Sequence, residues 1–174
     1  SIPWLRETIL GEEVRVPLDS FWQVNPLVAD QVFGTVASWF RQTGARSLID
    51  VYGGIGAFSL AIGKDAQFRV VIENDRLAIE AAKYNHAQKE LKAQIIYGNA
   101  ETLLPKVLTK ITPAETTLVL DPPRTGFNAA ITSNGRLFAT HSQLGAWSWK
   151  LADATDVAPL LQPGLAMAGV ELQV

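Results

Sequence analysis

The sequence predicts an α/β fold in which a mostly parallel sheet has helices on both faces. Short apolar runs alternate with longer segments of helical character, and these runs are residues 48–51, 68–73, 94–97 and 116–120. The first run leads through a glycine-rich turn, residues 52–56, directly into a helix-compatible segment. Strands that are joined through helices pair in parallel by right-handed crossovers, so the four runs are expected to form one sheet.

Composition narrows the class of protein. The chain has 174 residues, enough for one domain with a core, and 48% of them are hydrophobic. A formal net charge of -2 gives no global basic field for nucleic acid. The sequence has no cysteine, which excludes disulfides, thiolate metal sites and a cysteine nucleophile, and its two histidines argue against a metal site. No run reaches the length of a membrane span, so we expect a cytoplasmic protein without a membrane partner.

The turn after the first strand has the features of a ligand site. Gly54 and Gly56 allow close approach of the backbone to a ligand. Ser59 stands where a dinucleotide fingerprint has its third glycine, and Asp50 would face a negatively charged pyrophosphate. S-adenosylmethionine has an ammonium and a sulfonium group, so an acid here suits it better. A purely structural turn also uses glycine, but the acids at this edge favour ligand binding.

Three further strand tips bring polar groups to the same edge. Glu73 ends the second run, where a carboxylate can accept hydrogen bonds from ribose hydroxyls. Asn99 follows the third run, and it either contacts an adenine edge or caps the next helix. Asp121 follows the fourth run, and Pro122 and Pro123 hold it rigidly. Together with Asp50, these side chains are expected to line one edge of the sheet.

The remaining segments are predicted from periodicity and capping. Asn25 and the proline after it predict a helix over residues 26–42, with an apolar stripe of Val28, Val32, Val36, Trp39 and Phe40. A second helix is expected over residues 76–92, with His86 at its surface. Residues 1–20 are predicted as an extended lead-in with a strand or hairpin arm at 12–17, and residues 21–174 as the single domain, atypical over 127–174. Within that tail, strands are expected at 135–140 and 167–174 and a helix at 153–161.

Five motifs together resemble the catalytic domain of the RNA uracil-5-methyltransferases. Residues 21–26 resemble the family's aromatic-x-Gln-Val-Asn-Pro, and residues 50–60 its Asp-Leu-Tyr-Cys-Gly-x-Gly-x-Phe-Ser-Leu. Glu73 matches the family's ribose-binding acid. Residues 98–101 resemble Gly-Asp-Ala-Glu, and residues 121–126 resemble Asp-Pro-Pro-Arg-x-Gly. The resemblance covers residues 21–126 in order, and the first and last motifs together are the most specific.

The resemblance implies a Rossmann-like class I methyltransferase fold, S-adenosyl-L-methionine as the cofactor and RNA as the partner. It implies cofactor roles for Gln23, Tyr52, Glu73 and Asp121, beside Asp50, Gly54, Gly56 and Asn99 from the turn and strand-tip arguments. In the family, the acid at the position of Asp121 also belongs to the approach to the target base.

The sequence departs from the family in its last third. The family attacks carbon 6 of uracil with a cysteine, and none is present, so we assign no catalytic residue and expect no uracil-5 methylation. The family's last strand is expected to be missing between the fifth strand and the strand at 167–174. The edges of both strands would then lack a partner, and the tail from residue 126 would be loosely packed or paired with another chain. The alternative is a non-catalytic module that binds S-adenosylmethionine or RNA. Methylation of an exocyclic amino group is disfavoured, because Arg124 stands where such enzymes place an aromatic residue.

Overall fold

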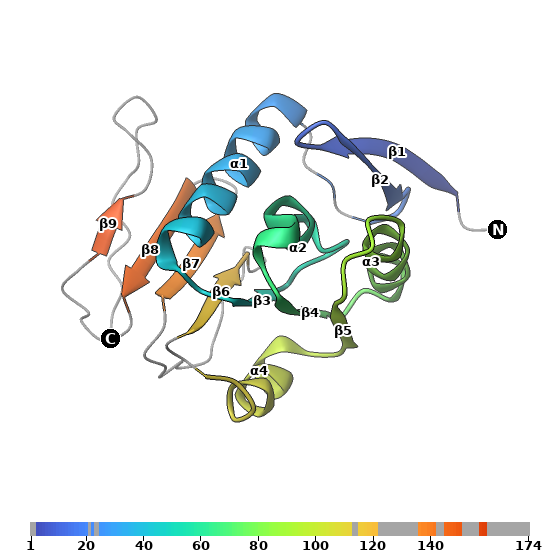
Figure 1. Cartoon of the computed structure of the whole chain (residues 1–174). Coiled ribbons are helices and arrows are strands. Elements are labelled where there is room, and N and C mark those ends of the chain that lie inside the picture. Colours follow the sequence, from blue (N-terminus) through green and yellow to red (C-terminus); the bar gives the residue numbers. More distant parts are fainter. Residues whose placement is uncertain are drawn as a thin grey trace.

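The computed structural model describes residues 3–20, 22, 25–112 and 115–121, together with the backbone of three strands beyond them. Within these residues the main sheet has seven strands in the order β5-β4-β3-β6-β7-β8-β9 (Figure 1). Their bounds are β3 Ser47–Val51, β4 Phe68–Glu73, β5 Gln94–Tyr97, β6 Thr116–Leu120, β7 Arg136–His141, β8 Gly145–Lys150 and β9 Val157–Pro159. The strands from β5 to β7 pair in parallel, and β8 and β9 are antiparallel. The predicted parallel sheet is therefore confirmed.

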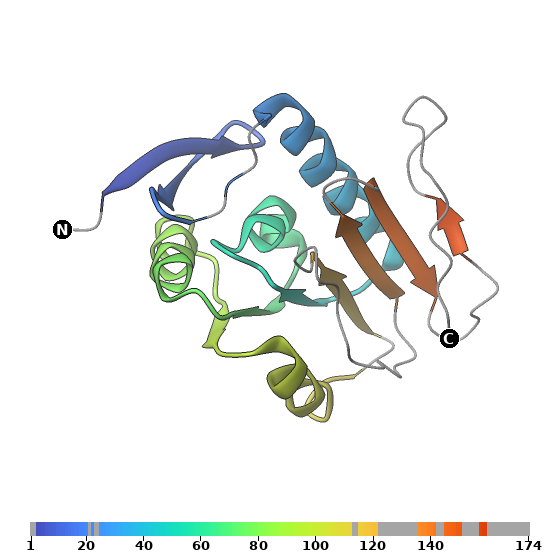
Figure 2. The same cartoon turned by 180° about the vertical axis from the view of Figure 1, so that it is seen from behind.

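Helices cover both faces of this sheet. The helices α1 (Pro26–Thr43), α2 (Ala57–Ile62) and α3 (Arg76–Gln88) lie on one side, and α4 (Ala100–Leu108) lies on the other (Figures 1 and 2). Successive strand side chains point to opposite faces. Leu48 and Val119 accordingly belong to the core cluster of α1, α2 and α3, whereas Ile49 belongs to the cluster of α4. The Rossmann-like α/β class expected from the sequence is confirmed.

The helix α1 begins and ends at the residues that the sequence marks. Asn25 accepts a hydrogen bond from the backbone nitrogen of Val28 at 3.3 Å, and Gly44 ends the helix with a φ of 68°. The sequence places Val28 on the apolar stripe of this helix, but its side chain is exposed, so this part of the prediction is wrong. Other positions form the buried face. The buried residues of α1 are Ala29, Phe33, Val36, Ala37 and Phe40.

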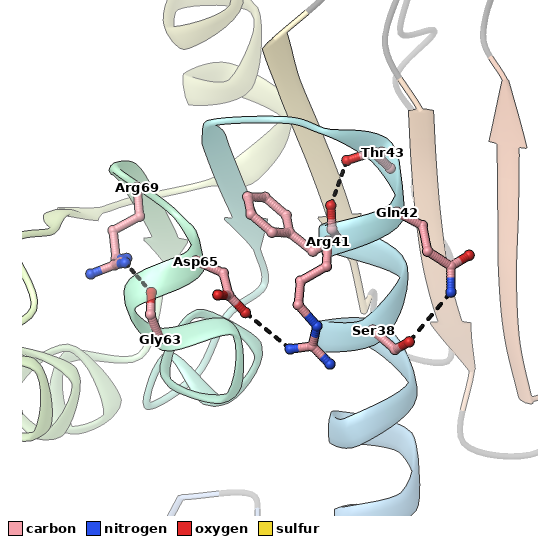
Figure 3. A network of polar contacts seen from close by, with 8 residues as sticks. Ser38, Arg41, Gln42, Thr43, Gly63, Asp65 and Arg69 are labelled. Carbon is pink, nitrogen blue, oxygen red and sulfur yellow. Dashed lines mark hydrogen bonds and ion pairs between the residues drawn. The ribbon is translucent and has the colours of Figure 1, made fainter.

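Two contacts join α1 to the segment that follows the glycine turn. Phe33 packs edge-on against Phe58 of α2, with their ring centroids 5.4 Å apart. Arg41 forms an ion pair of 2.9 Å with Asp65 in the short 3-10 helix η1 (Gly63–Asp65) (Figure 3). Since both partners of the ion pair are exposed, the aromatic contact is the stronger of the two restraints.

The first described residues form a hairpin of β1 (Trp4–Ile9) and β2 (Glu12–Pro17), as the sequence suggests for the second of these. Asn85 of α3 accepts from the backbone nitrogen of Arg15 at 2.8 Å and donates to the Arg15 carbonyl at 2.9 Å. Ile9, Val14 and Val16 of the hairpin are buried in the cluster that contains α1 and α2. The division into residues 1–20 and 21–174 stays a prediction.

Two expectations for the tail are wrong. The backbone of Val157–Pro159 forms β9 rather than part of a helix, because it pairs with β8, and proline is tolerated on a short outer strand. The edge of β7 is not open, since β8 pairs with it over its whole length. β8 is formed by residues in which the sequence shows no clear period. The strand expected at 167–174 lies outside the described residues.

No helix in the described part of the chain is long and apolar enough to cross a membrane.

Candidate functional site

Three of the predicted site residues, all of them acids, lie at the carboxyl edge of the parallel strands. Asp50 lies in β3, Glu73 ends β4, and Asp121 directly follows β6. Backbone hydrogen bonds hold the loops after these strands to their neighbours: Gly53 N to the Ile72 carbonyl at 3.1 Å, and Asp121 N to the Val51 carbonyl at 3.3 Å. The acids of three adjacent strands are thereby gathered at one place, as the sequence predicts.

The turn between β3 and α2 depends on its glycines for different reasons. A Cβ on Gly53 would lie 2.7 Å from Val71 Cγ1, so this residue must lack a side chain for packing. Gly54 has a φ of 56°, and a Cβ there would meet no atom within 4 Å. A ligand can therefore approach the backbone at Gly54, whereas neighbouring atoms of the protein cover the backbone at Gly53.

Glu73 is held by the backbone on both sides. Its Oε2 accepts from Gly54 N at 2.8 Å, and its Oε1 accepts from Asn74 N at 2.7 Å and Asp75 N at 2.8 Å. A carboxylate has about four acceptor positions, so these three bonds leave one on Oε2, beside the open glycine. The arrangement orients the group for one further donor, and its role toward ribose stays a prediction.

Asp50 is fully buried and only half satisfied. Its Oδ2 accepts from Ser59 N at 3.0 Å, while Oδ1 has no hydrogen-bond partner among the residues that the structure describes. Burial raises the pKa of Asp50 to about 8, the hydrogen bond from Ser59 opposes this rise, and the nearby charges of Asp121 and Glu73 add to it. A buried acceptor without a donor is costly, so this oxygen is suited to an external donor or cation.

His86 is not a surface residue, and the sequence prediction for it is wrong. Its side chain is buried, because α3 packs with this residue against the glycine turn. A Cβ added to Gly56 would lie only 2.5 Å from His86 Cε1. Nε2 lies 2.8 Å from Ser59 Oγ, and Nδ1 lies 2.7 Å from the Ala82 carbonyl oxygen. Since a carbonyl only accepts, Nδ1 bears the proton and Nε2 accepts from the Ser59 hydroxyl. Burial lowers the pKa of His86 to about 4, which keeps the ring neutral.

Tyr52 and Asn99 make contacts with their own protein. The Tyr52 hydroxyl donates to Glu101 Oε1 at 2.6 Å, and its ring packs against the core cluster on the α4 side. Burial and then this hydrogen bond raise the pKa of Tyr52. Asn99 accepts from Thr102 N at 3.2 Å and so caps α4, which is one of its two predicted roles. The cofactor roles of both residues stay predictions.

Gln23 lies outside the described residues, so its predicted role is not tested. Among the described residues, no group of three or more histidine, cysteine, aspartate or glutamate side chains could hold a metal ion. The sequence prediction omitted Gly53, Ser59 and His86 from the site. The position of Ser59 in the glycine fingerprint could have indicated that it belongs to the site. Nothing in the sequence indicates this for His86, because its burial depends on how α3 packs against α2.

Curated relatives match most of this chain but only a small part of their own length. The mouse protein named tRNA (uracil-5-)-methyltransferase homolog A is 30% identical over 128 residues, which are 73% of this chain and 21% of that protein. An uncharacterized RNA methyltransferase of Caldanaerobacter subterraneus is 37% identical over 108 residues, 62% of this chain and 24% of that protein. The resemblance read from the motifs is thereby confirmed, and the chain spans about a quarter of these relatives.

Solved structures share the fold at low sequence identity. The Pyrococcus abyssi tRNA (uracil-54, C5)-methyltransferase, solved with S-adenosyl-L-homocysteine, has a TM-score of 0.62 at 19% identity, over 79% of this chain and 34% of that one. The putative methyltransferase yhhF from Escherichia coli has a TM-score of 0.57 at 21% identity, over 80% and 82% of the two chains. Both support the class I methyltransferase fold.

A protein-family model described as conserved hypothetical protein 95 matches residues 23–149. This range contains the glycine turn, Glu73 and Asp121, and it is well over half of the sequence. The chain therefore belongs to the family described as conserved hypothetical protein 95.

Proposed function

We propose that this chain is the S-adenosylmethionine-binding part of an RNA methyltransferase, with uracil in RNA as the family substrate. The observation on which the proposal rests is the half-satisfied acid Asp50 beside the open backbone of Gly54. The donor brings an ammonium, a sulfonium and two ribose hydroxyls, which match the unpartnered Oδ1 and the acceptor position left on Glu73. The named RNA methyltransferases among the relatives support RNA as the partner.

The residues present fit such a cofactor. Gly54 and Glu73 would bind the ribose side, while Asp50 and Asp121 would face the positively charged methionine end. The cofactor would supply the methyl group, and these residues would only bind and orient it. Nothing in this group provides a nucleophile for carbon 6 of uracil.

Calorimetry with S-adenosylmethionine and S-adenosylhomocysteine tests the proposal. Glu73→Ala should weaken binding by about 1–3 kcal/mol, the scale for hydrogen bonds to a charged group. Part of that loss comes from the freed Gly54 N–H, so Glu73→Gln, which keeps an acceptor for it, should lose less. Glu80→Ala, an exposed acid of α3 paired with Lys83, is the control and should bind normally. The proposal fails if the unmodified chain binds neither compound, or if Glu73→Ala binds as well as the control.

A second candidate is a module that binds the cofactor or RNA without methylating uracil. The absence of cysteine from the sequence favours it, because the family reaction begins with a thiolate. Binding of S-adenosylmethionine without methyl transfer would support this candidate, and transfer to carbon 5 would exclude it.

A further inference from the structure

We propose that binding of a cationic ligand at the carboxyl edge releases a proton from Asp50, so that the site distinguishes the positively charged methyl donor from its uncharged thioether product. The proposal rests on the proposed cofactor function and deepens it. It adds a proton to the binding equilibrium: the O–H bond of the neutral Asp50 carboxyl group breaks, the proton goes to solvent, and the carboxylate stays behind facing the ligand.

Burial with too few hydrogen-bond donors favours the neutral form of Asp50 when no ligand is bound. A buried carboxylate needs several donors, yet Asp50 receives one, from Ser59 N at 3.0 Å to Oδ2. Oδ1 has no partner within the described residues. The side chain is 0% exposed, so solvent does not compensate for the missing donors. A proton on Oδ1 removes the uncompensated charge at this buried position.

The surrounding charges act in the same direction. β4 and β6, the strands on either side of β3, bring Glu73 and Asp121, and both acids disfavour a further negative charge on Asp50. From the helical face, α2 contributes the Ser59 N–H, and α3 contributes His86, which is neutral and reaches Asp50 only through Ser59. Burial, the largest effect, and these two acids raise the pKa of Asp50 to about 8.

A bound cation reverses this balance. A positive charge close to a carboxylate favours the ionised form, so the pKa of Asp50 falls and its proton leaves. Because only the ionised form attracts the cation fully, affinity should rise with pH until about pH 8, where Asp50 is already ionised in the free protein. The thioether product lacks the sulfonium charge and should release less of the proton and bind less tightly near neutral pH.

Calorimetry at pH 7 in phosphate and in Tris, whose ionisation enthalpies differ, counts the protons. S-adenosylmethionine should displace about one proton more from the unmodified chain than from Asp50→Asn, which has no acid to ionise. The same measurement with S-adenosylhomocysteine, which has the ammonium but no sulfonium, gives the contribution of the ligand's ammonium in each protein. Asp65→Asn removes a carboxylate from η1, away from the carboxyl edge, and should leave the proton count unchanged.

A second measurement does not depend on how well Asp50→Asn folds. Carbon-13 NMR of the aspartate carboxyl groups in the unmodified chain should show one group titrating near pH 8 without ligand and several units lower with S-adenosylmethionine. Equal proton counts for the unmodified chain and Asp50→Asn, or an Asp50 already ionised at pH 7 in the free protein, would overturn this proposal alone. Failure of both ligands to bind would overturn the proposed function as well.

Discussion

Gly56 shows how a single residue connects the ligand turn to a distant helix. Its φ is 79°, a left-handed conformation that other residues adopt at a cost, and the His86 ring leaves no room for a side chain. His86 in turn binds the Ser59 hydroxyl, and Ser59 N binds Asp50. The geometry of the turn therefore depends on a buried histidine 30 positions away in the sequence.

Replacing Gly56 by alanine should destabilise the fold for two separable reasons. The left-handed conformation costs about 1–2 kcal/mol, and overpacking against His86 adds about 1–3 kcal/mol. Gly44→Ala is the matched control, because its φ is 68° and a Cβ there meets nothing within 4 Å. Urea unfolding should show the larger loss for Gly56→Ala, and a smaller loss when His86→Ala is already present. Equal losses at Gly44 and Gly56 would mean that the ring does not restrict the turn.

At the scale of elements, one side chain of α3 joins that helix to β2 of the hairpin by two hydrogen bonds. Asn85 is 2% exposed and makes both of its hydrogen bonds to the backbone of Arg15. The Arg15 guanidinium also lies over the Tyr84 ring, 4.0 Å from its centroid. The hydrogen bonds of Asn85 and the cation–π contact of Tyr84 come from neighbouring positions of α3. Together they determine how the hairpin lies on this helix.

Asn85→Ala should loosen this hairpin more than the rest of the chain. Two part-buried backbone groups of Arg15 lose their partners, and since a fully buried unsatisfied group costs about 1–3 kcal/mol, each loss should lie near the lower end of that scale. Hydrogen exchange should show faster exchange in residues 4–17 and little change in β3 and β4. Gln88→Ala, an exposed position on the same helix, serves as the control. Uniform acceleration through the whole sheet would contradict a local role for Asn85.

The elements that the sequence predicts well are those whose residues determine them locally. β4, β5 and β6 have the predicted bounds, because apolar runs between turn residues require no knowledge of their neighbours. The burial of His86 and the pairing of β8 with β7 were not predicted, because both depend on which distant segment lies opposite. In the site, Asp50 and Glu73 could be placed from strand tips alone, whereas the missing partner of Asp50 Oδ1 could not.

At the scale of the whole molecule, binding of the cofactor and transfer of its methyl group are separate steps. We expect no methylation at carbon 5 of uracil by this chain alone, because that carbon is a weak nucleophile until carbon 6 forms a covalent adduct. The sequence has no thiol to form it, and positioning of the reactants does not replace it. A radiolabelled methyl-transfer assay on unmodified RNA, mapped to the modified atom, is the direct measurement. Label on carbon 5 well above a no-enzyme control would identify another nucleophile.

The hydrogen bonds between Arg15 and Asn85 join residues 70 positions apart in the sequence, and this separation affects the order in which the fold can form during synthesis. At synthesis rates of about 5–20 residues per second, Asn85 is made roughly 4–14 seconds after Arg15. During that interval α1 and α2 are made, and they share the core cluster of Ile9, Val14 and Val16, but the Asn85 side chain that binds the Arg15 backbone is still absent. The hairpin is therefore synthesised before α3, and the hydrogen bonds that join it to α3 form only after that helix has been made.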